Sequence, residues 1–65
     1  MRDINRIFPM ANEIACLWIN NVPDWRFSQL MMNFFTWFGL DPFYLEDDEF
    51  LDQFKKFINE IKGRD

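Results

Sequence analysis

The chain has 65 residues and a net charge of −4, and 49% of its residues are hydrophobic while 28% are charged. This balance excludes a disordered tail and a membrane span, and it leaves room for one small domain over residues 1–65. Histidine is absent, and serine, threonine and cysteine occur once each, which removes most nucleophile and general-base arrangements. We therefore expect no enzymatic activity and no catalytic residue.

A domain of this size buries only about 60% of its unfolded-chain surface, and it usually needs a disulfide, a metal or a partner subunit. The single cysteine, Cys16, can close no intrachain disulfide and is too few for a zinc site. We expect no metal and no cofactor, and we interpret Cys16 as a small buried or interfacial hydrophobe. Oligomerisation remains the expected source of extra stability. One cysteine and no long apolar run favour a cytoplasmic protein without a membrane span.

The first predicted helix covers residues 7–21, where apolar side chains recur at spacings of three and four. Pro9 has no amide hydrogen to donate, so it belongs in the first turn. Pro23 lies just beyond the expected end of the helix. The stripe that we expect to face the core consists of Ile7, Ala11, Ile14, Ala15 and Trp18.

The second predicted helix covers residues 25–38, with Asp24 as its N-cap and Gly39 ending it in a left-handed conformation. Arg26 lies near the positive end of this helix, and we expect a carboxylate from residues 41–49 to compensate its charge. The core-facing stripe of the helix is Phe27, Leu30, Met31, Phe34, Phe35 and Phe38.

The connection to the third helix begins with Asp41 and Pro42, which are typical of the N-cap and first position of a short turn. The third helix is predicted over residues 47–62, with acids in its first turn, lysines later and Gly63 as its stop. Its core-facing stripe is Phe50, Leu51, Phe54, Phe57, Ile58 and Ile61. The sequence thus predicts an all-α fold, a small three-helix bundle with a short capped turn between helices 2 and 3.

Residues 41–52 contain six acids and no base, which disfavours direct binding of nucleic acid. The preferred interpretation is helix capping and a solvated face, because acids favour the positive end of a helix. A calcium loop is not indicated, since neither its glycine nor its ligand spacing is present. Mimicry of nucleic-acid phosphates is the functional alternative. The residues of this predicted acidic surface are Glu46, Asp47, Asp48, Glu49 and Asp52.

More apolar side chains are present than one small three-helix core can enclose. A contiguous exposed apolar patch usually marks an interaction site, and Trp, Tyr, Phe and Met are typical interface residues. The alternative is that the surplus side chains simply wrap a well-filled core. The predicted protein interface consists of Trp25, Met32, Trp37, Phe43, Tyr44, Met10 and Leu17.

Several segments spread over nearly the whole chain form a recognisable pattern. These are Met1-Arg2-Asp3, Leu17-Trp18, Pro23-Asp24-Trp25-Arg26-Phe27, Gln29-Leu30, Asp41-Pro42-Phe43-Tyr44 and Glu46-Asp47-Asp48-Glu49-Phe50. The pattern resembles a family of short uncharacterised proteins of Gram-positive bacteria, especially Clostridia, and of their phages and mobile elements. The resemblance implies no established activity and no catalytic or binding residue.

The sequence therefore favours a non-catalytic protein–protein interaction module, working as a homodimer or as a small inhibitor or adaptor. The resemblance to phage proteins implies one form of it, an inhibitor of a host defence or host enzyme. The alternative is an acidic decoy that mimics nucleic acid and blocks a nucleic-acid-binding protein. The expected partner is another protein or a second copy of the chain, and neither nucleic acid nor a membrane.

Overall fold

The computed structural model describes residues 2–62, in which three α-helices and two short 3₁₀ turns account for all regular secondary structure. This confirms the predicted all-α three-helix bundle with a short turn between its second and third helices. In chain order the elements are η1 (Ile4–Arg6), α1 (Ile7–Asn21), α2 (Phe27–Phe38), η2 (Pro42–Tyr44) and α3 (Asp47–Lys62). The predicted helix stop at Gly63 lies outside the described residues.

Helix α1 has the predicted bounds and is preceded by one additional 3₁₀ turn. Asp3 caps this turn, because its Oδ1 accepts a hydrogen bond of 2.9 Å from the backbone N–H of Asn5. Pro9 lies in the first turn of α1, where its missing amide hydrogen costs no helical hydrogen bond. The helix ends before Val22, whose N–H still donates to the carbonyl of Trp18.

Helix α2 begins two residues later than predicted, and Asp24 lies in the preceding turn rather than at the N-cap. The N-cap is Arg26, whose extended backbone N–H donates to Oε1 of Gln29 over 2.9 Å. The Gln29 side chain therefore accepts a hydrogen bond from the backbone N–H of the N-cap residue, as in one half of a capping box. At the other end Gly39 has a φ of 75°, so the predicted left-handed ending is confirmed.

The connection between α2 and α3 is capped as the sequence predicts. Oδ1 of Asp41 accepts a 3.0 Å hydrogen bond from the N–H of Phe43, and Pro42 occupies the first position of η2. Helix α3 starts at Asp47 as predicted, and the carbonyl of Glu46 receives the first helical hydrogen bond, from Phe50. Three acids in the first turn and a lysine in the last complement the helix dipole.

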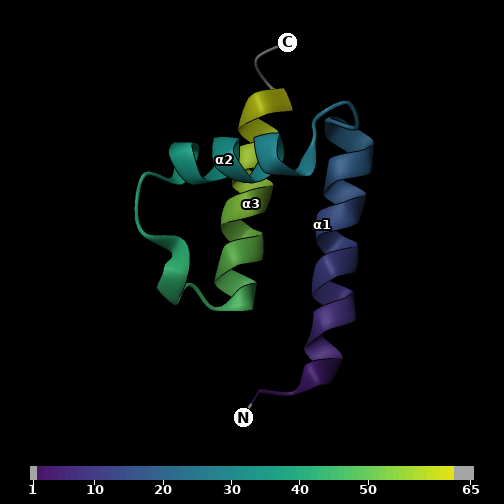
Figure 1. The fold of residues 1–65 in the computed structure, drawn as a ribbon, viewed down its shortest axis with the longest axis vertical. Helices are drawn as coiled ribbons and strands as arrows, with labels where there is room; N and C mark the ends of the chain where they lie inside the picture. The colour runs from purple at the N-terminus through teal and green to yellow at the C-terminus, as the bar shows by residue number, and fades with distance from the viewer. Residues whose placement is uncertain (1, 63–65) are drawn as a thin grey trace.

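The three helices do not run alongside one another throughout. Helices α1 and α3 lie side by side and run in the same direction, while α2 crosses α3 near its C-terminal half (Figure 1). Segment η2 then returns the chain toward the beginning of α3. As a result α1 lies at one side of the molecule, and its first turns extend beyond the start of α3.

The buried core comes entirely from α2 and α3. It consists of Leu30, Phe34, Phe54, Phe57 and Ile58. Phe34 is its centre, with ring centroids of Phe50, Phe54 and Phe57 at 5.0, 5.2 and 5.6 Å in edge-to-face geometry. Aromatic pairs of this kind add about 0.5–1.5 kcal/mol each beyond the area they bury. Helix α1 contributes no buried residue.

The molecule has more surface than its mass requires. Its accessible surface is 5261 Å², whereas about 4,450 Å² is the expectation for a monomeric protein of 8.0 kDa. Its radius of gyration is 12.1 Å, against about 11 Å for a compact chain of this length. Helix α1 lies at one side of the molecule and has no buried residue, so several of its apolar side chains face solvent.

Candidate functional site

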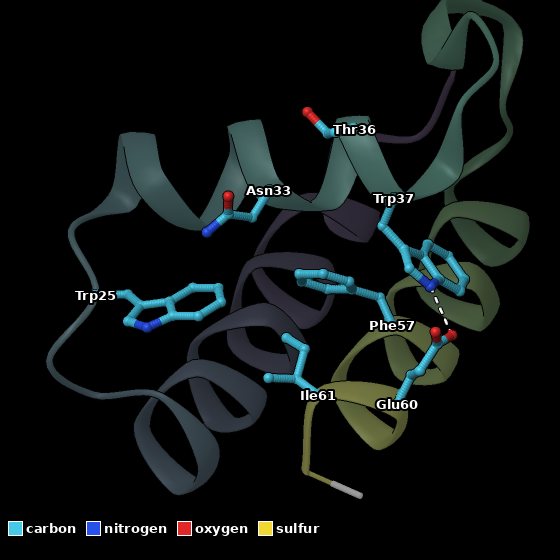
Figure 2. A pocket seen from close by; sticks show the side chains of 7 residues that line it. All are labelled: Trp25, Asn33, Thr36, Trp37, Phe57, Glu60 and Ile61. Carbon is cyan, nitrogen blue, oxygen red and sulfur yellow. Dashed lines mark hydrogen bonds between the residues drawn. The ribbon is translucent and has the colours of Figure 1, made fainter. Parts of the chain in front are cut away.

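A groove between α2 and α3 is lined by both tryptophans of the predicted interface. It encloses about 390 Å³, and its lining consists of Trp25, Asn33, Thr36, Trp37, Phe57, Glu60 and Ile61. Figure 2 shows Trp25 and Trp37 on either side of Phe57, with Ile61 on the α3 side and Asn33 turned in from α2. The ring centroid of Phe57 lies 6.4 Å from that of Trp25 and 5.7 Å from that of Trp37. Three aromatic rings thus line one concave surface.

Hydrogen bonds hold the Trp37 side chain and the backbone at Trp25. The indole Nε1–H of Trp37 donates to Oε2 of Glu60 over 2.6 Å, which ties α2 to α3 across the groove (Figure 2). Trp25 lies in the turn between α1 and α2, and its backbone carbonyl accepts a 2.9 Å hydrogen bond from Nε1 of Trp18. The backbone N–H of Trp25 donates to the carbonyl of Val22. The Trp25 indole itself is positioned by packing against the ring of Phe57.

The lining of the groove is mostly apolar and aromatic. Among residues 2–62, Glu60 is the only ionisable residue that lines it. The volume is at the low end for ligand pockets, which run from roughly 300 to 1,000 Å³, and it suits a single large side chain. A buried aromatic anchor in such a pocket is a common source of binding energy between proteins.

The other predicted interface residues lie elsewhere. Met32, Phe43 and Tyr44 are 66%, 79% and 82% exposed, and the rings of Phe43 and Tyr44 contact each other at 4.9 Å on η2. Met10 and Leu17 are half-buried on α1, and Leu17 packs against the core. The seven residues thus form several separate patches and not one continuous face.

The assignment of apolar residues to core or surplus needs correction at several positions. Trp25, Trp37 and Leu17 belong to the periphery of the core, because each is partly buried and packs against its buried residues. Conversely, Ile7 and Phe27 were predicted to face the core and are 49% and 57% exposed. Cys16, also expected to be buried or interfacial, is exposed in the single chain.

A further set of strongly exposed apolar side chains lies along η1 and α1, where Ile4, Phe8 and Ile19 are 73%, 85% and 65% exposed. None of these three residues belongs to the predicted interface. The signal that could have found this face is a helical periodicity at positions 4, 8, 11, 15 and 19, which shares Ala11 and Ala15 with the stripe assigned to the core. We call this face the α1 stripe, and it consists of Ile4, Phe8, Ala11, Ala15 and Ile19.

The predicted acidic surface is partly neutralised by the N-terminal segment. Arg2 pairs with Glu46 over 2.9 Å, and Arg6 pairs with Asp47 over 2.8 Å. Arg26 was predicted to pair with a carboxylate of residues 41–49, but it forms no ion pair within residues 2–62.

The remaining acids of this surface, Asp48, Glu49 and Asp52, are exposed. Oδ1 of Asp48 accepts a hydrogen bond from the backbone N–H of Glu49, at the start of α3. Between Arg2 and Lys62 no group of three or more cysteine or acidic side chains has the geometry to hold a metal ion. Asp48 and Glu49 lie in the first turn of α3, where negative charge complements the helix dipole, and Asp52 lies further along the helix.

Comparison of the chain with protein-family models, with curated proteins and with solved structures gave no match. The resemblance to short clostridial and phage proteins therefore stays a prediction. None of the helices in residues 2–62 combines the length and the apolar character needed to cross a membrane. Function must accordingly be argued from the surfaces of the chain itself.

Proposed function

We propose that this protein is a non-catalytic protein–protein interaction module. One observation carries the proposal: ten large apolar side chains are exposed on the described part of the chain, while only five are buried. Exposed apolar patches on a small protein commonly mark sites of contact with other proteins. The reducing cytoplasm remains the compartment that we propose, which a single unpaired cysteine fits.

The groove of Trp25 and Trp37 is the proposed anchor site for a partner protein. Its aromatic lining would receive one apolar side chain of the partner. The net charge of −4 would attract a basic partner over longer distances. An inhibitor or adaptor that holds a host enzyme is one form of this function.

The test uses a photo-cross-linking residue at the groove. Asn33 is exposed and lines the groove, so p-benzoylphenylalanine at this position leaves the buried core untouched. We expect irradiation in the producing cells to give discrete covalent adducts from this position. The matched control is the same residue at Lys56, which is exposed on α3 and does not line the groove. Equal adduct patterns from the two positions would contradict the anchor site.

The acidic decoy remains the alternative, and the ion pairs weaken it. Two of its five carboxylates already face arginines of the same chain, which leaves few free charges to imitate a phosphate backbone. The combined changes Asp48→Asn, Glu49→Gln and Asp52→Asn leave both ion pairs in place. A decoy would lose its adducts and their salt dependence in this variant, whereas the module that we propose would keep them.

A further inference from the structure

Element η1 and the first turns of α1 carry strongly exposed apolar side chains. Phe8 is 85% exposed and Ile4 73%, and both lie on the α1 stripe with Ala11, Ala15 and Ile19. Residues spaced by three, four and seven lie on one side of a helix, so positions 8, 11, 15 and 19 form a continuous face. This face lies beside the one formed by Ile14, Leu17 and Trp18, which packs against the core.

The same stripe holds a hollow near the C-terminal end of α1. It is lined by Ala15, Trp18, Ile19 and Pro23 and measures about 340 Å³, and its surface is almost entirely apolar. Alanine at position 15 leaves the space that a larger side chain would fill. The N-terminal half of the stripe therefore offers a projecting aromatic ring, and the C-terminal half offers a cavity for one.

We propose that a second copy of this chain covers the α1 stripe, with the two α1 helices antiparallel about a two-fold axis. This antiparallel pairing inserts Phe8 of each copy into the Ala15–Pro23 hollow of the other. Ala11 of one copy then meets Ala15 of the second copy where the helices cross, and small residues there permit close approach. A two-fold interface requires such self-complementarity, because each surface contacts its counterpart twice. This inference adds a self-association surface to the proposed interaction function and lies apart from the Trp25–Trp37 groove.

The distribution of charge selects the antiparallel arrangement. Glu13 is the only charged residue between positions 7 and 23, and it lies 3.9 Å from Lys55 of α3, away from the stripe. No like charges would therefore face each other across the axis. The six acids of residues 41–52 lie near the start of α1, as the pairs made by Arg2 and Arg6 show. An antiparallel dimer holds the two acidic segments at opposite ends, whereas a parallel one would place them together.

The α1 stripe combines exposed apolar side chains with a hollow of matching chemistry, and none of its five residues is charged.

The first experiment measures mass by light scattering between about 10 µM and 1 mM, a range in which ordinary dimers with micromolar dissociation constants associate. We expect the wild type to approach twice its 8.0 kDa mass. Phe8→Glu should remain monomeric, because a carboxylate entering an apolar hollow weakens association on the order of 100-fold. Glutamate in the first turn of a helix is compatible with the helix dipole, so the fold should be kept, as circular dichroism will show.

The matched control is Phe43→Glu, which changes an equally exposed phenylalanine on η2 and adds the same charge. It should dimerise like the wild type. A wild type that stays monomeric at 1 mM, or a Phe8→Glu variant that still dimerises, overturns the α1 dimer. The Asn33 cross-linking experiment is independent of this outcome, because monomeric Phe8→Glu retains the groove. A wild type that stays monomeric at 1 mM but still gives the Asn33 adducts would refute this inference alone.

A second experiment tests the direction of pairing, in a Cys16→Ser background that removes the native thiol. Mixing Ala11→Cys with Ala15→Cys should give rapid mixed disulfides, because these positions face each other in the antiparallel dimer. Ala11→Cys alone should link slowly, since its two copies lie beyond the roughly 7 Å that a disulfide can span between Cα atoms. Faster linkage of Ala11→Cys with itself would show parallel pairing and overturn the proposal.

Discussion

Helix α1 and the α2–α3 pair stabilise the fold in different ways. The α2–α3 pair holds all five buried side chains, centred on Phe34, and its helices share a continuous aromatic contact network. Helix α1 has no buried residue and is attached through the half-buried Ile14, Leu17 and Trp18 and through exposed ion pairs. The difference indicates that α2 and α3 form the scaffold, while α1 presents a surface that is still available for contact.

The largest expected effect comes from removing the centre of the scaffold. Phe34→Ala would leave a cavity among the rings of Phe50, Phe54 and Phe57 and cost about 3–5 kcal/mol of unfolding free energy. The whole domain holds about 3–10 kcal/mol at usual values per residue. We therefore expect the variant to lose its cooperative urea transition. Phe43→Ala, an exposed control, should unfold like the wild type.

The next effect concerns the attachment of α1 to that scaffold. Trp18→Phe keeps a ring against Phe27, whose centroid is 5.8 Å away, but removes the hydrogen bond to the carbonyl of Trp25. We expect a loss of about 1–2 kcal/mol, because the half-buried carbonyl loses its partner. Hydrogen exchange should accelerate in α1 before it does in α3. Equal acceleration in both helices would mean that α1 and the scaffold unfold as one unit.

A change confined to the end of α2 tests the scaffold alone. Gly39 has a φ of 75°, and a Cβ there would meet nothing closer than the carbonyl of Trp37 at 4.0 Å. The cost of Gly39→Ala is therefore that of the left-handed backbone, about 1 kcal/mol. We expect a lower urea midpoint with an unchanged slope and with α1 still docked. Gly39→Asn should lose less, because asparagine tolerates this conformation better.

The same contrast explains what the sequence could predict. The core-facing stripe of α3 was predicted correctly. The other side of that helix is charged, so only one side can be buried. Helix α1 has apolar residues on two adjacent faces, and helical spacing alone does not say which of them meets the rest of the chain. The crossing of α2 over α3 depends on tertiary packing, and it decides that Trp25 and Trp37 share one groove.

The smallest expected effect concerns the ion pairs that help to attach α1 to the scaffold, as distinct from its apolar contacts. Arg6→Gln removes the 2.8 Å ion pair with Asp47. Both side chains of this pair are partly exposed, so its contribution to the free energy of unfolding is about 0.2–1 kcal/mol. Salt screens such pairs, so the difference in urea midpoint from the wild type should shrink as sodium chloride rises toward about 1 M. Lys56→Gln removes the same charge from a residue without an ion pair in residues 2–62, and it controls for net charge. A salt-independent loss in Arg6→Gln alone would show that this arginine supports α1 through packing, and α1 would then be less separate from the scaffold than its burial indicates.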